Sequence, residues 1–428
     1  MDTLLKFTIE NFRSISDRKT ISLVPKSIKD QPVDNVVSRD QYKYLRTAAI
    51  YGANSSGKSN LVRGIECMLH LVRSSVRMND EDALDYQPFL LNGINQSVPT
   101  LYEIEFVTDG KRYRYGFSNT DKRIYDEWLV RIEKQKEVSL FIRNEEGIGV
   151  NEKLFPEGKN LEERTNDNRL FLSLVGQLGG ETSNSVIQFF RKGISVISGL
   201  DTEQYGSFTK HYLSNKLPGS EDMKQFFQNL QLGFTSVSTM VHEFDLSDLP
   251  SSMPEKVKED IAKRLLGKKR IKVMSSHDIY DDSGNVVKTE VFDFDEMESA
   301  GTRKLFDFAG PMFDTLASGS VLVVDELDAK MHPLLSLELV RLFNDPKRNK
   351  KGAQLIFTTH DTNLLSSKIL RRDQIWFTEK DDNERTDLYN MMQIFLPDGS
   401  KPGGDGNIER NYINGRYGAI PYIRPYSE

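Results

Sequence analysis

Eight consecutive residues near the N-terminus combine two glycines, a lysine and a serine at fixed spacing. They read Gly52-Ala53-Asn54-Ser55-Ser56-Gly57-Lys58-Ser59 and match G-x-x-x-x-G-K-[ST]. The glycines let the backbone curl around an anion, and the following helix adds its positive N-terminal end. In such a loop the lysine holds β- and γ-phosphates, and the serine hydroxyl is a ligand of Mg²⁺. We predict contacts between a nucleotide and these residues: Gly52, Asn54, Ser55, Ser56, Gly57, Lys58, Ser59 and Asn60.

Two acidic residues follow an apolar run in the C-terminal third of the chain. Val321 to Val324 is fully apolar, as in a strand buried within a parallel sheet, and Asp325-Glu326 follows it directly. An aspartate at the end of such a strand can hold Mg²⁺, directly or through water. The neighbouring glutamate is placed to accept a proton from an attacking water. We predict Asp325 as a metal ligand and Glu326 as the catalytic base.

A histidine ends the next apolar run. Leu355 to Phe357 is followed by two threonines and then His360, one helix and one strand after Glu326. A neutral imidazole there could donate to a γ-phosphate and so report its presence. We predict catalytic roles for Lys58, Glu326 and His360.

Small residues open a helical stretch before Val321. The segment Ser299-Ala300-Gly301-Thr302-Arg303-Lys304 would leave the first N–H groups of its helix open to an anion. We predict Ser299, Gly301 and Thr302 as a second nucleotide contact. The alternative is an ordinary helix cap.

The spacing of apolar residues places these motifs between predicted strands and helices. Leu5 to Ile9 and Thr20 to Leu23 alternate as strands do, and Thr47 to Tyr51 is a short apolar run. A helical spacing of apolar residues begins at Lys58. Further expectations are a hairpin over 101–117 with its turn at Asp109-Gly110, helices at 184–197, 219–232, 254–266, 301–316 and 334–343, and a hairpin tip at 380–386.

Composition excludes several classes of protein. The chain has 428 residues, 38% hydrophobic and 28% charged, and its 24 Phe and 16 Tyr suffice for a large core. Its single cysteine, Cys67, allows no intrachain disulfide, which favours the reducing cytoplasm. No apolar stretch is long enough for a membrane span. The net charge of −6 argues against a surface that binds nucleic acid everywhere, although a local basic patch stays possible.

In this order, the phosphate loop, the small-residue segment, the acidic pair and the histidine resemble the ABC-type ATPases, in particular their SMC/RecF/OLD branch. The resemblance covers about 1–145 and 285–428. Its further motifs are Asn11-Phe12-Arg13-Ser14-Ile15 at the start, Gln87-Pro88-Phe89 at the position of the Q-loop, Asp328 at the D-loop, and Met331-His332-Pro333. The resemblance implies that Gln87 is a metal ligand alongside Ser59 and Asp325.

The C-terminal segment resembles that of a smaller group within this branch. Tyr412 to Pro421 is similar to the tail of RloA/AbiL-like (AAA_15/AAA_21-type) phage-defence ATPases. The chain departs from the transporters of the superfamily, because Thr302 replaces the second glycine of their signature and no glutamine follows. Lys330 stands where a small polar residue is usual in the D-loop.

The expected architecture is α/β: a split ABC-type P-loop ATPase head formed by 1–150 and 285–428, with a mixed sheet, flanking helices and an antiparallel β portion. Residues 151–284 are expected to form a mainly helical insertion.

The resemblance implies an ATP- and Mg²⁺-dependent, cytoplasmic ATPase. It would pair as a homodimer or higher homo-oligomer with ATP at the subunit interface, and act as the sensor or regulator of an anti-phage system with a separate effector. One alternative is a self-contained OLD-like nuclease, against which stand the short C-terminal segment and the lack of an Asp-x-Asp pair after His360. Another is a RecF/SMC-like DNA-repair ATPase. Lys268 to Lys272 could then contact phosphates, although we interpret this run as a solvated helix end.

Overall fold

The computed structural model describes residues 2–29, 32–134, 136–200, 203–246, 249, 253–265, 267–395, 399, 401–402 and 407–421. The chain divides into two compact units. The first comprises Met1–Leu200 with Ser318–Glu428, and the second comprises Asp201–Ala317.

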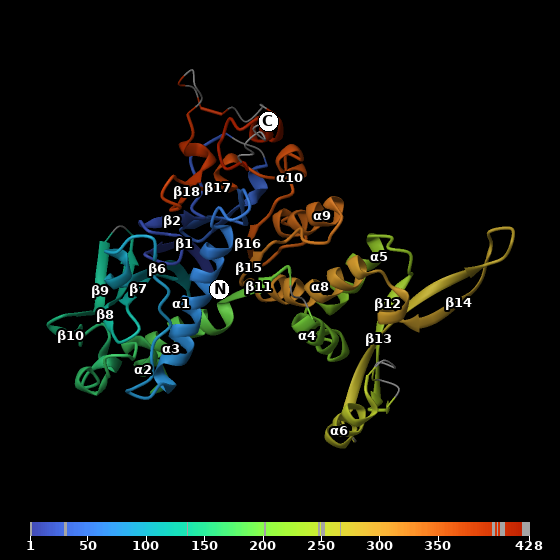
Figure 1. Ribbon diagram of the computed structural model, residues 1–428, viewed down its shortest axis with the longest axis horizontal. Helices are drawn as coiled ribbons and strands as arrows, with labels where there is room; N and C mark the ends of the chain where they lie inside the picture. The colour runs from blue at the N-terminus through green and yellow to red at the C-terminus, as the bar shows by residue number, and fades with distance from the viewer. Residues whose placement is uncertain are drawn as a thin grey trace, which may run out of the picture. The chain divides into compact units, whose positions relative to one another are not determined.

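The first unit contains a seven-stranded antiparallel sheet of order β10-β9-β8-β7-β6-β1-β2 (Figure 1). The strands are β1 (Thr3–Glu10), β2 (Lys19–Ser22), β6 (Thr100–Thr108), β7 (Lys111–Asn119), β8 (Ile124–Glu133), β9 (Lys136–Asn144) and β10 (Gly147–Val150). The hairpin predicted over 101–117 is β6–β7, with its turn at Asp109-Gly110. A small separate hairpin joins β3 (Val36–Arg39) and β4 (Tyr42–Leu45).

The second sheet of this unit is six-stranded, with order β11-β15-β16-β5-β17-β18. Its strands are β5 (Thr47–Gly52), β11 (Ile194–Ser198), β15 (Val321–Asp325), β16 (Gln354–Thr358), β17 (Ile375–Lys380) and β18 (Thr386–Asn390). All neighbours are parallel except β17–β18. Ala49 and Ile50 point to opposite faces of β5, and both are fully buried. Both faces of the sheet are therefore covered, as its apolar strands predicted.

Helix α1 (Lys58–Ser74) packs against both sheets, contacting β1 of the antiparallel one and β5, β11 and β15 of the parallel one (Figure 1). Its apolar face joins Ile50, Val323 and Phe106 in a single core. The other helices of the unit are α2 (Phe171–Gln177), α3 (Glu181–Gln188), α9 (Pro333–Asn344), α10 (Asn363–Ser366) and α11 (Ile408–Ile413). The mixed α/β fold with an antiparallel portion is confirmed.

The second unit combines helices with a three-stranded antiparallel sheet of order β12-β13-β14. Its elements are α4 (Glu203–Ser214), α5 (Ser220–Asn229), β12 (Ser236–Glu243), α6 (Glu255–Leu265), β13 (Lys269–Tyr280), β14 (Val286–Asp293), α7 (Phe294–Met297) and α8 (Ala300–Ser318). Aromatic rings form part of its core, where Phe306 contacts Phe227 and Phe294. This sheet was not predicted from the sequence.

Two local predictions are wrong. Residues 184–197 are not one helix: α3 ends at Gln188, a π-helical turn follows, and Ile194 begins strand β11. Pairing of β11 with β15 overrides the local helical pattern, because it satisfies the backbone groups of a β-branched segment within a buried sheet. The basic run Lys268 to Lys272 is not a helix end, since β13 begins at Lys269. The predicted end of a helix at Leu266 lies outside the described residues.

The second compact unit does not coincide with the predicted insertion, 151–284. It begins later, because α2 and β11 pack on α1 of the first unit, α3 packs on α2, and β11 pairs with β15. It also ends later, because β14, α7 and α8 belong to it. The segment Ser299 to Lys304, which the sequence assigned to the head, therefore lies in the second unit.

Candidate functional site

The phosphate loop connects β5, which ends at Gly52, to α1, which begins at Lys58. Gly57 precedes the helix with φ 108°, a conformation that L side chains rarely adopt. A Cβ at this position would lie 2.1 Å from Oγ1 of Thr386, so a side chain has no room either. Within the loop, Asn54 and Ser55 are exposed. The predicted strand–loop–helix is confirmed, and its second glycine is required by both backbone and packing.

Lys58 lies within the curve of this loop. Its ammonium donates to the carbonyl oxygens of Gly52 at 2.7 Å and Ala53 at 3.0 Å, and the residue is only 5% exposed. Burial lowers the pKa of Lys58 to about 8, although the carboxylates of Glu326 and Asp325 oppose this shift. The attraction indicates that both acidic groups are near the ammonium.

Hydroxyl groups from distant parts of the chain support the loop from behind. The Thr386 hydroxyl donates to the carbonyl of Ser56 at 3.0 Å, and the Ser56 hydroxyl is bonded to that of Thr378 at 2.6 Å. The Ser14 hydroxyl is bonded to the Thr386 hydroxyl at 2.7 Å. It also accepts from the side-chain amide of Asn60 at 2.7 Å. Sequence reasoning missed Thr378 and Thr386, because neither has a recognisable motif around it.

A threonine orients the acidic pair at the end of β15. The Thr358 hydroxyl donates to Oδ1 of Asp325 at 2.7 Å and accepts from the N–H of Glu326 at 2.7 Å. Glu326 has φ 56°, and its carbonyl oxygen would lie 1.9 Å from a Cβ added at Gly199. The Gly199 N–H in turn donates to the carbonyl of Asp325 at 2.6 Å. Thr358 thus orients the Asp325 carboxylate, and Thr358 and Gly199 together constrain the backbone of Glu326. Neither residue was predicted.

His360 follows β16 and is exposed. The backbone N–H of His360 donates to Oδ2 of Asp328 at 3.2 Å, which joins the predicted D-loop residue to the histidine. Burial lowers the pKa of His360, the charge on Lys58 lowers it further, and Asp328 and Glu326 oppose the shift. The lowered pKa favours the neutral imidazole, the form that its predicted role requires.

The strand order explains why these groups meet. β15, β16 and β5 are consecutive parallel strands, so their carboxyl ends lie at one edge of the sheet. Asp325, His360 and the phosphate loop follow these three ends. Ligands of open α/β sheets bind outside such carboxyl ends. The structure therefore brings Lys58, Asp325, Glu326 and His360 together in one polar cluster.

Gln87 is held by neighbours on the N-terminal segment. Its amide oxygen, the atom that a metal would need, accepts from the Arg13 guanidinium at 3.1 Å. Its amide nitrogen donates to Asp85 at 2.9 Å, and its carbonyl accepts from the Arg13 N–H at 2.7 Å. A role for Gln87 as metal ligand stays a prediction, because the oxygen would have to accept a metal in addition to Arg13.

Ser299 caps helix α8 in the second unit. Its hydroxyl accepts from the Thr302 N–H at 3.2 Å and is bonded to the Thr302 hydroxyl at 2.9 Å. Ser299 is exposed and Gly301 is half-buried, whereas Thr302 is buried. The cap that we considered as the alternative is thus present, and nucleotide contacts of Ser299, Gly301 and Thr302 stay predictions.

The segment Met331 to Pro333 starts helix α9, where Nδ1 of His332 accepts from the Leu334 N–H at 3.2 Å.

The C-terminal segment packs behind the phosphate loop. The ring of Tyr412 lies 5.7 Å from that of Tyr51, at the end of β5.

A protein-family profile described as "AAA domain, putative AbiEii toxin, Type IV TA system" matches residues 48–366, about three quarters of the chain. The chain belongs to this AAA_21 family. The matched range runs from β5 into α10 and contains the phosphate loop, the acidic pair and His360. The polar cluster therefore lies within the range that the family profile matches.

Two solved structures are similar to this AAA_21 protein over most of its length. The SMC head domain from Thermotoga maritima is 13% identical and covers 90% of this chain and 98% of its own, with a TM-score of 0.42. The recombination mediator protein RecF with ATP, of the RecFOR pathway, is 12% identical and covers 85% of this chain and 95% of its own, with a TM-score of 0.35. A search of curated proteins gave no match. In the described part of the chain, no helix is both long and apolar enough to cross a membrane.

Proposed function

We propose that this protein hydrolyses ATP at the phosphate loop and acts as the ATP-dependent sensor or regulator of a bacterial anti-phage system, together with a separate effector. The observation that carries the ATPase part is the convergence of Lys58, Asp325, Glu326 and His360 at the carboxyl ends of adjacent parallel strands. The family description, which names AbiEii and a type IV toxin–antitoxin system, supports the defence part.

Each residue has a separate role in this proposal. The Lys58 ammonium binds the β- and γ-phosphates, and the N–H groups at the start of α1 add to the attraction. Ser59 and Asp325 would hold Mg²⁺, which neutralises charge on the phosphates when bound. Glu326 accepts the proton of the attacking water, and the neutral His360 donates to the γ-phosphate.

The oxygen atoms of Ser59 and Asp325 are suitable ligands for Mg²⁺. Asp325 uses Oδ1 to accept from Thr358, which leaves Oδ2 for a cation. Magnesium in phosphate sites typically takes one or two carboxylates, with the remaining ligands from phosphate oxygens and water. The donor set of Ser59 and Asp325 has this composition.

Two protein variants test the ATPase. Glu326→Gln keeps the shape of the side chain but removes the base, so it should bind ATP and release phosphate at least about 100-fold more slowly. Lys58→Ala should lose ATP binding itself. The measurements are calorimetric ATP titration and phosphate release, with the exposed-site variants Glu384→Gln and Lys350→Ala as matched controls. Normal turnover by Glu326→Gln would exclude Glu326 as the base.

Dimerisation is tested in the same background. In the proposal, ATP lies between the phosphate loop of one subunit and Ser299 to Thr302 of the other. Glu326→Gln with ATP should therefore sediment as a dimer, and Gly301→Trp added to it should stay monomeric while still binding ATP. Dimers that form equally well in both variants would leave Ser299 to Thr302 as a helix cap alone.

Assays on the purified chain separate this proposal from the nuclease and DNA-repair alternatives. With ATP, Mg²⁺ and Mn²⁺, the chain should leave DNA and RNA intact, since the effector is a different polypeptide. Cleavage that is lost on substitution of acidic residues here would favour the nuclease. Strongly salt-dependent DNA binding would favour the repair ATPase.

A further inference from the structure

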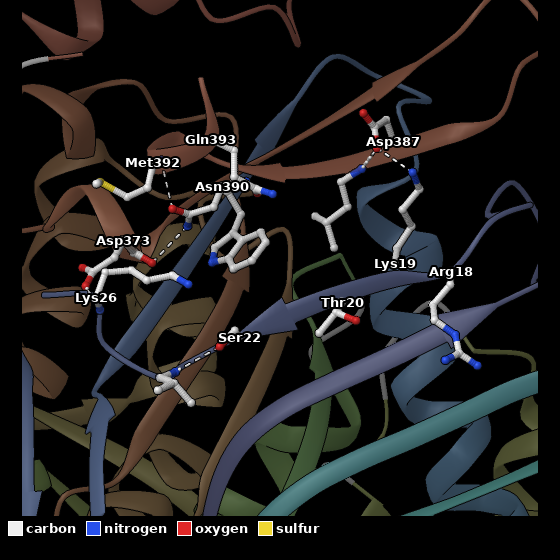
Figure 2. Close-up of a pocket in the computed structure, with 13 residues that line it drawn as sticks. Arg18, Lys19, Thr20, Ser22, Lys26, Asp373, Asp387, Asn390, Met392 and Gln393 are labelled. Carbon is white, nitrogen blue, oxygen red and sulfur yellow. Dashed lines mark hydrogen bonds and ion pairs between the residues drawn. The ribbon is translucent and has the colours of Figure 1, made fainter. Parts of the chain in front are cut away.

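A pocket of about 450 Å³ lies in the first unit, between the free edges of its two sheets. β2 is the last strand of the antiparallel sheet and β18 the last strand of the parallel one. Figure 2 shows Lys19 and Asp387 at one end of this pocket, and Lys26 and Asp373 at the other. Its size falls within the range of small-molecule sites.

The acidic side chains of the pocket are already neutralised. Asp387 pairs with Lys19 at 2.6 Å, which ties the two sheet edges together. Asp373 is 2% exposed and receives two bonds from the Arg371 guanidinium, at 2.9 and 3.0 Å, as well as the N–H of Lys26 at 2.9 Å. These carboxylates therefore have little capacity left to attract a cation.

One cation of the pocket is not neutralised in this way. Lys26 is exposed, and its ammonium has no ion-pair partner within the described ranges. Figure 2 shows its side chain extending into the pocket. The third basic residue, Arg18, is bonded to Glu10 at 3.0 Å. The pocket thus has an excess of positive charge at the Lys26 end.

A buried tryptophan also lines the pocket. Trp376 on β17 lines the pocket and is 6% exposed, and its indole N–H has no hydrogen-bond partner in the part of the chain that the structure describes. A buried donor left unsatisfied destabilises the protein, so an acceptor supplied from outside would be favoured.

We propose that this pocket binds a small anion, whose carboxylate or phosphate oxygens accept from the Lys26 ammonium and the Trp376 N–H. The charge excess selects an anion, and the indole N–H selects an acceptor oxygen. The proposal does not depend on ATP hydrolysis, because the pocket shares no lining residue with the phosphate loop.

Intrinsic fluorescence offers a direct test, since the chain has two tryptophans, Trp128 and Trp376. The full chain carrying Trp128→Phe and Lys58→Ala reports on Trp376 alone and has weakened anion binding at the phosphate loop. Inorganic phosphate and citrate are titrated separately at constant ionic strength, balanced with chloride. We expect a saturable change for at least one of them, and the pair distinguishes phosphate from carboxylate ligands.

Lysine variants decide whether the pocket is responsible. Lys26→Ala should weaken binding about tenfold or more, whereas Lys29→Ala, an exposed lysine of the same segment that does not line the pocket, should not. Calorimetry with Trp128 retained repeats the titration if Trp128→Phe fails to fold. No saturable response to either anion, or an unchanged response in Lys26→Ala, overturns the proposal.

Discussion

The hydroxyl of Thr358, at the end of β16, joins two strands by donating to Oδ1 of Asp325 at 2.7 Å. The Thr358 hydroxyl oxygen also accepts from the N–H of Glu326 at 2.7 Å. One fully buried threonine thus orients the predicted metal ligand and the backbone of the predicted base together.

Thr358→Val keeps the shape of this side chain and removes both hydrogen bonds. We expect a loss of about 1 to 3 kcal/mol in the free energy of unfolding, because a partly buried carboxylate oxygen and a partly buried N–H lose their partner. ATP turnover should fall about 10- to 100-fold, as for other residues that position metal ligands. The measurements are urea unfolding and phosphate release. The control is Thr315→Val, which removes a buried hydroxyl bonded to the carbonyl of Pro311 in α8; a similar loss of turnover there would contradict the assignment.

Gly57→Ala should abolish ATP binding. The new Cβ would require a backbone with φ 108° and would overlap the Thr386 hydroxyl at 2.1 Å, so the loop must move. Gly110→Ala is the matched control, because Gly110 also has positive φ, 71°, but has open space around its Cα. Calorimetric ATP titration of both variants separates loop displacement from backbone strain. Retained affinity in Gly57→Ala would show that the loop tolerates the methyl group.

ATP affinity should decrease above pH 8. The pKa of Lys58 is lowered to about 8, and its charged form is the one that attracts phosphate. Affinity is therefore complete well below pH 8 and falls as pH rises through this pKa, by about tenfold at pH 9. Binding at pH 8 should take up about half a proton, which calorimetry in buffers of different ionisation enthalpy measures. Lys58→Arg stays charged throughout, so any ATP binding that it retains should be independent of pH over this range.

Gly199→Ala should slow hydrolysis while ATP still binds. A Cβ at this position would lie 1.9 Å from the carbonyl oxygen of Glu326, so the base must shift. We expect turnover to fall about tenfold or more, since a displacement of about 1 Å near the chemistry can cost about 100-fold. Gly149→Ala is the control, because its nearest heavy atom would be 3.9 Å away. Unchanged phosphate release by Gly199→Ala would mean that Glu326 does not depend on this contact.

Local chemistry made part of the site predictable. The phosphate loop and the acidic pair are each a single contiguous stretch of sequence. A phosphate needs several N–H groups of one curled segment, and a cation needs a carboxylate at a strand end. Their flanking elements, β5, α1 and β15, follow from short-range hydrophobic patterns and appear as predicted.

The wrong predictions arose where pairing outweighed local pattern. Ile194 to Ser198 fits a helical spacing, yet it pairs in parallel with β15 in the register Ile194↔Val321. The strands β12 to β14 were missed because their two faces are partly exposed, so they lack the apolar alternation of a half-buried sheet.

The sequence by itself determined which residues we propose for the chemistry: Lys58, Asp325, Glu326 and His360 stand in motifs that local composition makes visible. Only the tertiary structure decided what supports them. Thr386 lies far along the chain from the loop that it contacts, and Gly199 reaches Glu326 only because β11 pairs with β15. Such contacts depend on strand order and on the space between side chains, and no local stretch of sequence encodes either.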